Sequence, residues 1–383
     1  MKIVHITSNY IEGWGYQENL LPLYQQRAGH DVVVISDNEH LRYAQNPSLA
    51  QKIISQGMEY EKDGIKIYKI KTYLNTSSTS FICNGVFRLL KKEHPEIIFH
   101  HDLNTSTLSA AAKYKKYHTE VKLYVDNHAD WINESKNRLW HRLFYDTVIP
   151  LQVKRLGNTV NYYIGVSPLR CQYLKKVFKV PEDKIRFLPI GCDTYLAEQV
   201  FESREELKNK YNVPLDAFVV VSGGKIDRSK GTLSLIEACC DLVKKGEKIH
   251  LVLFGKIDDE VKNAASQFTW ITTLGWCDRI STLSLLKMAD LACWPWLHTT
   301  LIEDSVASGT PLVVKMSENV SHFSHEKAGF FLECGDKDEL VKALIDVKNN
   351  IESYRRNIQN ARDKFSYATI VKRLDKEDFY ELL

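Results

Sequence analysis

The residues best suited to chemistry lie in the second half of the chain. An apolar run there ends in Gly223-Gly224-Lys225, and Lys230 follows five positions after the first lysine. Glycines at the end of a buried strand let a ligand approach backbone N–H groups, and lysines add compact positive charges. These groups can hold a diphosphate without a metal ion. Because the Gly-Lys-Ser/Thr ending of a Walker loop is missing, lysines at an exposed helix start remain the structural alternative.

A second polar segment lies downstream, between Trp294 and the turn that begins at Gly309. It includes Glu303 and Asp304 at the expected start of a helix. Carboxylates suit the hydroxyls of a ribose. Acidic residues in the first turn of a helix are also favoured by the helix dipole, whatever the function. The residue types alone leave both interpretations open.

Glycines follow two other apolar runs. Gly255 ends the run Ile249–Phe254, and Gly13 and Gly15 lie between the first predicted strand and a predicted helix. Such a turn lets the backbone approach a ligand at a helix N-terminus, which attracts anionic or hydroxylated groups. Glycines are also common in plain turns. They indicate a binding site only in combination with the two lysines.

The elements that would position these residues alternate along the whole chain. Short β-branched runs are separated by longer amphipathic stretches, which predicts parallel strands with crossover helices. We expect helices at Tyr16–Ala28 and Thr105–Tyr117. The predicted strands are Lys2–Thr7, Asp31–Ser36, Ile65–Ile70, Glu96–His101, Lys122–Asn127, Asn161–Val166, Ile185–Ile190, Phe218–Ser222, Ile249–Phe254, Trp270–Leu274, Leu291–Trp294 and Pro311–Lys315.

The domain organisation follows from the length and from where the alternation restarts. A chain of 383 residues exceeds the ~150 residues of one typical domain. The alternation restarts at Phe218–Ser222, after a polar helical stretch at Leu196–Tyr211 and a turn at Asn212–Asp216, which places the linker near Gly191–Ser203. We therefore predict two doubly wound, Rossmann-like α/β domains, at residues 1–195 and 196–364, with ligands bound in the cleft between them. A closing helix is expected over residues 365–383 and should pack back toward the first domain.

Composition excludes several classes of protein. The net charge of +3 and the pI of about 8.2 are too mild for a dedicated nucleic-acid binder, so no nucleic-acid partner is expected. The eight cysteines include no metal-type Cys-x-x-Cys pair and are expected to be reduced. Neither a signal peptide nor an apolar run of ~18 residues is visible, which predicts a cytoplasmic protein.

Basic and aromatic residues gather in the first half, notably from Lys136 to Arg155. This stretch contains Arg138, Trp140, Arg142 and Lys154. The pattern suits an anionic membrane surface or a phosphate-bearing acceptor. A solvated helix face is the alternative. If the first interpretation holds, the protein would lie peripherally on the inner face of the membrane.

The order of these motifs resembles that of the retaining GT-B glycosyltransferases of family 4, over nearly the whole chain. The matching motifs are Gly29-His30-Asp31-Val32, Gly165-Val166-Ser167, Lys184-Ile185, Pro189-Ile190-Gly191-Cys192-Asp193, the Gly-Lys segment, Ala289-Asp290 and Gly309-Thr310-Pro311. The resemblance implies the GT-B fold and a nucleotide sugar, UDP-linked by expectation, as donor. It implies neither a cofactor nor an obligatory metal.

The resemblance also assigns roles to single residues. Lys225 and Lys230 match the Arg and Lys that hold the donor diphosphate, although a lysine at the first position reduces a bidentate contact to a point charge. His128 matches the active-site histidine near the donor sugar. Asp304 stands where the second acid of the Glu-x7-Glu motif contacts the ribose, with Glu303 as a substitute one residue earlier.

The first acid of that motif is missing. Trp296 occupies its position, eight residues before Asp304. The missing contacts to donor sugar and phosphate would then come from the backbone N–H groups of His298–Leu301 and from the hydroxyls of Thr299 and Thr300.

The resulting hypothesis is an enzyme that transfers a hexose or N-acetylhexosamine from the donor to a hydroxyl of a glycan or lipid-linked glycan, with retained anomeric configuration, in polysaccharide biosynthesis. Two alternatives stay open. One is a catalytically silent GT-B partner that stabilises or recruits an active transferase, which the missing acid motivates. The other is a sugar-nucleotide epimerase on the same kind of fold.

Overall fold

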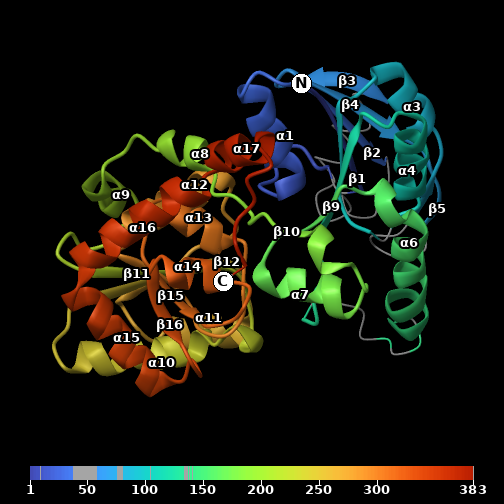
Figure 1. Ribbon diagram of the computed structural model, residues 1–383. Coiled ribbons are helices and arrows are strands. Elements are labelled where there is room, and N and C mark those ends of the chain that lie inside the picture. Colours follow the sequence, from blue (N-terminus) through green and yellow to red (C-terminus); the bar gives the residue numbers. More distant parts are fainter. Residues whose placement is uncertain are drawn as a thin grey trace. The chain divides into compact units, whose positions relative to one another are not determined.

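Each half of the chain forms its own sheet in the computed structural model, which describes residues 1–8, 10–37, 58–75, 81–103, 105–132, 137, 139 and 141–382 (Figure 1). Contacts divide the chain into two compact units. The first is Met1–Pro189 with Ile370–Leu383, and the second is Ile190–Thr369. We call them the N-unit and the C-unit.

The N-unit contains an eight-stranded sheet in the order β10-β9-β8-β7-β1-β2-β4-β3. All its neighbours are parallel except β3 and β4. The strands are β1 (Lys2–Thr7), β2 (Asp31–Asp37), β3 (Glu59–Lys62), β4 (Ile65–Ile70), β7 (Ile97–His100), β8 (Lys122–Asn127), β9 (Tyr162–Gly165) and β10 (Ile185–Phe187). A small antiparallel sheet pairs β5 (Thr72–Asn75) with β6 (Phe81–Cys83).

Helices cover both faces of this sheet. In Figure 1, α1 lies on one side, and α3, α4 and α6 lie along the other. The helical elements are α1 (Gln17–Arg27), α3 (Val86–Glu93), α4 (Thr107–Tyr117), the π-helix η2 (His141–Val148), α6 (Ile149–Leu156), η3 (Gly157–Thr159), α7 (Pro168–Lys176) and η4 (Glu182–Lys184). The inner strands β1, β2 and β7 are almost completely buried, as expected for a parallel sheet covered on both faces.

The C-unit is built on a six-stranded parallel sheet in the order β13-β12-β11-β14-β15-β16. Numbered from its own first strand, this is the 3-2-1-4-5-6 order of the dinucleotide-binding fold. The strands are β11 (Phe218–Ile226), β12 (Ile249–Ile257), β13 (Ile271–Thr273), β14 (Leu291–Trp294), β15 (Leu312–Lys315) and β16 (Gly329–Leu332). The prediction of two doubly wound α/β sheets is confirmed.

Helices α10, α11 and α15 cover one face of the second sheet, and α12, α13 and α16 cover the other (Figure 1). The helical elements are α8 (Thr194–Glu198), α9 (Arg204–Lys210), η5 (Arg228–Lys230), α10 (Thr232–Lys244), α11 (Asp259–Ala265), α12 (Arg279–Met288), α13 (Leu301–Ala307), α14 (Ser321–His325), α15 (Lys337–Asn349) and α16 (Ile351–Phe365). Across the described ranges, no helix combines the length and apolar character needed to cross a membrane.

The closing helix differs from its predicted extent. Helix α16 ends at Phe365, and a separate helix α17 spans Tyr367–Asp375. Glu377 has a left-handed backbone with φ of 54°, which cannot continue a helix. The chain then becomes extended, and Tyr380 pairs with Phe187 of β10. The helix predicted to reach residue 383 is therefore wrong beyond Asp375.

Strand lengths differ from prediction at the two glycine-containing ends. Strands β11 and β12 stay paired through Gly224↔Gly255 to Ile226↔Ile257. Gly224, Lys225 and Gly255 thus belong to the ends of the strands, not to loops after them. A Cβ on Gly255 would lie 2.3 Å from the Gly224 carbonyl oxygen. Glycine at that position is what lets the two strands pair this far.

Candidate functional site

The predicted diphosphate site lies at the carboxyl edge of the C-unit sheet. The chain leaves β11 in one direction and β14 in the other, so the edge between these strands is the topological switch point where such sheets bind ligands. Lys225 is the last residue but one of β11, and the segment from Thr299 to Leu301 follows β14. A Cβ on Gly224 would lie 3.3 Å from Leu301 Cδ1 and 3.9 Å from Thr299 Oγ1. The structure therefore brings these predicted residues together.

The two lysines have different surroundings. The Lys225 side chain is 75% exposed, and its Nζ lies 3.4 Å from Asp227 Oδ2. Lys230 ends the short helix η5, is partly buried, and has no ion pair with any described residue. Asp227 caps η5 by accepting the Ser229 backbone N–H at 2.9 Å. Lys230 is thus the less exposed of the two lysines, and its charge is not paired with a described acid.

Trp296 takes a structural role at the position of the missing acid. Its indole N–H donates to the Gly335 carbonyl at 2.9 Å. A Cβ on Gly231 would lie 2.8 Å from the Trp296 ring, so the ring packs on the backbone that joins Lys230 to α10. This contact explains why a large aromatic side chain stands there. It also fixes the turn that follows Lys230.

The Thr299–Leu301 segment forms the start of α13. Thr300 is the N-cap residue, and its side chain makes no capping hydrogen bond. The Leu301 backbone N–H points at Thr299 Oγ1, 3.4 Å away. The predicted N–H and hydroxyl donors are therefore present, with one of them in a long contact within the segment.

The two acids of α13 differ in their partners. Asp304 Oδ1 lies 3.1 Å from Arg279 Nη2, and the same Nη2 lies 3.1 Å from Asp193 Oδ2. Burial raises the pKa of Asp304 to about 6, although Arg279 acts in the opposite direction. Glu303 is also buried, with Oε1 3.5 Å from His298 Nε2 and no hydrogen bond to Oε2 from any described residue.

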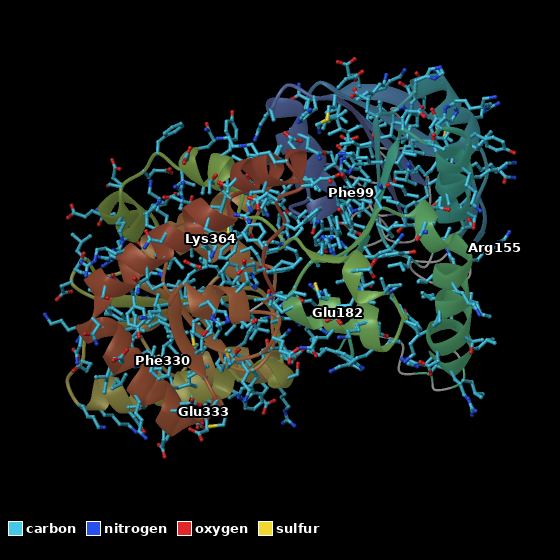
Figure 2. All side chains as sticks on the ribbon, viewed as in Figure 1. Phe99, Arg155, Glu182, Phe330, Glu333 and Lys364 are labelled. Carbon is cyan, nitrogen blue, oxygen red and sulfur yellow. The ribbon has the colours of Figure 1, made fainter. Side chains whose placement is uncertain are left out.

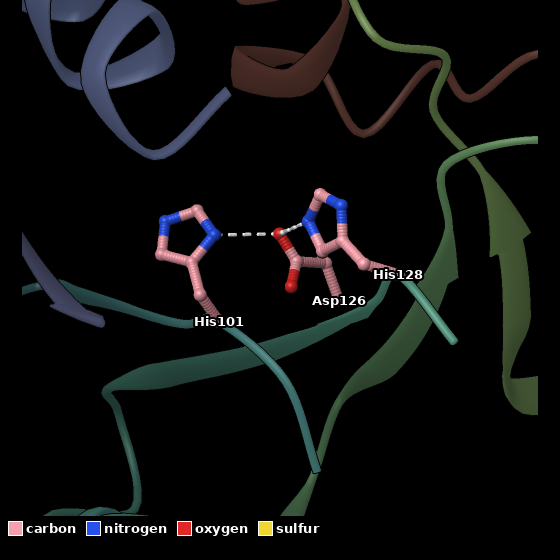
Figure 3. Close-up of side chains that lie close together, drawn as sticks. All are labelled: His101, Asp126 and His128. Carbon is pink, nitrogen blue, oxygen red and sulfur yellow. Dashed lines mark hydrogen bonds and ion pairs between the residues drawn. The ribbon is translucent and has the colours of Figure 1, made fainter. Parts of the chain in front are cut away.

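In the N-unit, His128 belongs to a cluster at the carboxyl edge of β7 and β8 (Figure 3). Asp126 Oδ2 accepts the His101 Nδ1–H at 2.6 Å and lies 3.3 Å from His128 Nε2. Asp126 Oδ1 accepts the Asp102 backbone N–H at 3.0 Å. Asp126 and His101 are fully buried, whereas the His128 side chain is 23% exposed. His128 is therefore the member that a ligand can reach.

Charge around His128 favours its protonated form. Burial alone would lower the pKa of His128, but Asp126, with Glu18 of α1 and Asp102, raises it to about 9. The same histidine ion pairs lower the pKa of Asp126, against the effect of its burial. At neutral pH the pair is a positively charged ring held by a carboxylate.

A second layer of hydrogen bonds supports this pair. His5 Nδ1 lies 3.1 Å from His101 Nε2, and His5 Nε2 lies 2.6 Å from Gln25 Oε1. Burial lowers the pKa of His5 to about 3, so His5 is neutral. Phe99, labelled in Figure 2, stacks against the His5 ring. Gln25, His5 and His101 thus hold Asp126 through a chain of buried contacts, and His128 is the partly exposed residue beside Asp126.

The side chains of His101, Asp126 and His128 could also ligate a cation, since one ligand atom from each lies within 4.8 Å of the other two. Two ligands of one tetrahedral zinc ion, each ~2.0–2.1 Å from it, would stand about 3.3 Å apart. Asp126 Oδ2 and His128 Nε2 stand at that separation, but the 2.6 Å between His101 Nδ1 and Asp126 Oδ2 is too short for two ligands of one ion and is that of a hydrogen bond. The spacing therefore favours an ion-paired network.

The backbone of His128 is positioned by α7. Arg170 Nε donates to the His128 carbonyl at 3.0 Å and lies 3.3 Å from Asp130 Oδ2. Ser167 caps α7 by accepting the Arg170 N–H.

The predicted Gly13 and Gly15 lie in the turn before α1, and Gly13 is exposed with φ of 77°. Glu18 lies in the first turn of α1, and its negative charge is one of those that raise the pKa of His128.

Sequence reasoning did not single out His101, Asp126 or Arg279. A usable signal existed for the first two, because polar residues follow the ends of adjacent parallel strands in His100-His101-Asp102 and Asp126-Asn127-His128. Arg279 gives no such signal, because it opens a helix far along the chain from Asp304 and Asp193.

Comparisons with known proteins decide the family. The profile described as "Glycosyl transferases group 1" matches residues 203–364, and that described as "Glycosyltransferase Family 4" matches residues 23–196. The chain belongs to glycosyltransferase family 4. The predicted family and its GT-B fold are thus confirmed.

Two solved structures match this family 4 glycosyltransferase over nearly its whole length. One is a glycosyltransferase from Rickettsia africae, with 17% identity, a TM-score of 0.68, and 98% and 97% of the two chains covered. The other is HepE from Anabaena in complex with UDP, with 15% identity, a TM-score of 0.69, and 98% and 99% covered. These likenesses establish the fold.

A curated relative is similar over a shorter range. It is the alpha-monoglucosyldiacylglycerol synthase of Acholeplasma laidlawii, 22% identical over 210 residues. The match covers 51% of this chain and 51% of that protein, so the chain spans about half the length of the curated relative.

Proposed function

We propose that this glycosyltransferase moves a hexose or N-acetylhexosamine from a UDP-sugar to a hydroxyl of a glycan or lipid-linked glycan, with retained anomeric configuration. The observation that carries the proposal is the position of Lys225 and Lys230 at the switch point of a sheet with the dinucleotide-binding strand order. The UDP bound to HepE, a protein of the same fold, supports the choice of base.

In the proposed reaction, the bond between the anomeric carbon and the diphosphate oxygen breaks. The acceptor hydroxyl forms its new bond on the same face, and its proton passes to the departing phosphate. The barrier is charge separation, so fixed positive charge near the phosphate has the largest effect. Lys230 supplies it with help from Lys225, and no metal ion is part of the proposal.

Asp304 remains the proposed ribose acid. A carboxylate has about four acceptor positions, so Asp304 can accept ribose hydroxyls while Arg279 holds it in place. Glu303, one residue earlier, is the competing candidate because its Oε2 accepts no hydrogen bond from the described residues. His128 would donate a hydrogen bond to an oxygen of the donor, which its positive charge strengthens.

The acceptor side of the proposal is a contact with an anionic membrane through the stretch from Lys136 to Arg155. Of its residues, Lys136, Arg138 and Trp140 lie outside the described part of the chain. Arg142, Lys154 and Arg155 are described and exposed. The lipid substrate in the name of the Acholeplasma laidlawii relative supports a membrane-borne acceptor. The protein would then act from the cytoplasmic face, without nucleic acid.

A thermal-shift screen of nucleotides tests the donor. A ligand at about 100 times its dissociation constant adds about 2.7 kcal/mol to the free energy of unfolding. We expect UDP and at least one UDP-sugar to raise the Tm, and matched ADP and GDP compounds to leave it unchanged. Stabilisation by ADP or GDP alone would overturn the choice of UDP. NMR of the product then tests whether the anomeric configuration is retained.

A further inference from the structure

A cavity of about 600 Å³ opens in the N-unit, away from the carboxyl edge that holds His128. Its lining includes Pro150, Leu151 and Lys154 of α6, and Lys179 and Lys184 from the segment after α7. Tyr163, near the start of β9, also lines it. Because parallel strands begin at the edge opposite the one where they end, this cavity is separate from the His128 cluster.

Tyr163 gives the cavity a buried hydrogen-bond donor. The residue is 1% exposed, and its hydroxyl has no hydrogen-bond partner among the described residues. Burial raises the pKa of Tyr163, so the hydroxyl keeps its proton. A buried hydroxyl without a partner costs free energy. An acceptor oxygen of a bound ligand would remove that cost.

The lysines make the cavity positive. Lys184 Nζ donates to the Val160 carbonyl at 2.8 Å and to the Gly157 carbonyl at 3.1 Å, which holds its charge in place. Lys179 donates to the Lys176 carbonyl at 2.6 Å. Lys154 is exposed and has no ion pair with any described residue. The one acid in the lining, Asp146, lies 3.4 Å from His141 Nδ1. An anion is the ligand that fits this charge.

Exposed apolar side chains continue from the cavity along the same helix. Leu143 of η2 and Leu151 of α6 are each 60% exposed, and Leu139, which precedes η2, is 83% exposed. Exposed Arg142 and Arg155 accompany them, and Arg155 is labelled on α6 in Figure 2. Tyr145 stacks on the buried Phe178 and anchors this helix to the end of α7. Apolar and basic groups on one helix favour the interface of an anionic bilayer.

We propose that the cavity binds the phosphate end of an anionic membrane phospholipid, while Leu143 and Leu151 enter the acyl region beside it. The Tyr163 hydroxyl donates to a phosphate or ester oxygen, and Lys154, Lys179 and Lys184 pair with the phosphate. The inference rests on the membrane contact of the proposed function, not on sugar transfer. It names a single-lipid site where that proposal named only a charged surface.

The test is calorimetric titration of the full chain with monomeric dihexanoylphosphatidylglycerol and dihexanoylphosphatidylcholine. We expect the anionic lipid to bind and the zwitterionic lipid not to bind. Tyr163→Phe, which keeps the ring, should weaken binding by roughly threefold to tenfold, the scale of one hydrogen bond. Lys154→Glu should weaken it at least as much. Lys116→Glu, an equal charge change on exposed α4 outside the lining, is the matched control and should bind as wild type.

Three outcomes would overturn the site. Equal losses in Lys154→Glu and Lys116→Glu would show a general charge effect. Unchanged binding in Tyr163→Phe would remove the hydroxyl from the site. Equal affinity for glycerol phosphate would point to a soluble phosphate compound instead. Sedimentation with phosphatidylglycerol vesicles distinguishes the cavity from the surface contact, because vesicle binding without monomer binding would keep the membrane contact and reject the cavity.

Discussion

The lysines of the C-unit and His128 of the N-unit both carry positive charge, but they differ in the groups that surround that charge. Lys225 and Lys230 are attached to a strand end and a short helix, and the first is largely exposed. His128 carries its charge because buried Asp126 holds it, and Asp126 is fixed in turn by His101 and the Asp102 backbone. Lys230 makes no ion pair with a described residue and Lys225 has only an exposed contact with Asp227, whereas His128 is paired with the buried Asp126.

This difference predicts what each region contributes. Lys230 makes no ion pair with a described residue, so its charge can act fully on a bound phosphate, and loss of this lysine should reduce the rate of transfer strongly at every pH. Charge that depends on a carboxylate partner should respond to pH and to removal of the partner. Substitutions at Lys230, Asp126, Asp304 and Lys225 test the contrast, and they are given in order of decreasing expected effect.

Lys230→Ala should lower kcat by on the order of 10²–10³, the scale seen when one preorganised charge partner of a transition state is lost. UDP release from the donor measures it. Lys244→Ala, which removes an exposed lysine from the other end of α10, is the control and should act as wild type. Turnover of Lys230→Ala at the wild-type rate would remove this lysine from the site.

Asp126→Asn should return the pKa of His128 from about 9 toward its ordinary value of ~6.5. At pH 8 roughly thirtyfold fewer molecules would then carry the ring proton, and activity should fall by about that factor. Near pH 5.5 the variant should approach wild type. A pH profile of kcat measures the change, and an NMR titration of His128 follows the pKa directly.

The same substitution predicts a change in stability with a defined sign. A raised histidine pKa stabilises the native protein fully below ~6.5 and loses this contribution as the pH rises through about 9. Asp126→Asn should lack that dependence. UDP affinity, which belongs to the C-unit, is the internal control and should not change. A wild-type pH profile in Asp126→Asn would show that Asp126 does not act through His128.

Asp304→Asn should weaken UDP binding about tenfold, the scale of a hydrogen bond to a charged group. Glu303→Gln should have a smaller effect. Because burial raises the pKa of Asp304 to about 6, wild-type affinity for UDP should fall as the pH drops through 6. Titration calorimetry measures both. If Glu303→Gln is the more damaging change, the ribose acid is Glu303, one residue earlier than proposed.

Lys225→Ala should reduce kcat by less than about tenfold, because this lysine is exposed and close to Asp227. Lys225→Arg, which restores a bidentate group, should equal or exceed wild type. Steady-state rates at saturating donor measure both variants. A loss of kcat in Lys225→Ala as large as that in Lys230→Ala would show that the exposure of Lys225 does not reduce its contribution to transfer.

Much of the fold could be predicted because local pattern and tertiary structure agree in the central strands. Strands β1, β4, β8 and β14 match their predicted bounds. The short edge strands β3 and β16 were not predicted. The continuation of β11 past two glycines was not foreseen either, because strand propensity argues against glycine and only its pairing with Gly255 permits it.

The site could be predicted only as far as its residues lie at strand ends. Gly224 and Lys225 lie at the carboxyl end of β11, and Thr299 lies in the segment after the neighbouring strand β14, which brings them together. The contacts of Arg279 with Asp193 and Asp304 join three separate elements, and no spacing in the sequence records them. The packing of Trp296 on Gly231 likewise depends on tertiary structure. Partners of this kind are visible only once the chain is folded.

The proposed transfer is measured directly as UDP release by the purified chain from a panel of UDP-sugars, with lipid and glycan acceptors and with EDTA present. We expect release from at least one UDP-sugar, a new glycoside of retained configuration, and loss of both products in Lys230→Ala. If UDP-sugars raise the Tm but release no UDP with any acceptor, the chain is a silent partner and the central claim is wrong.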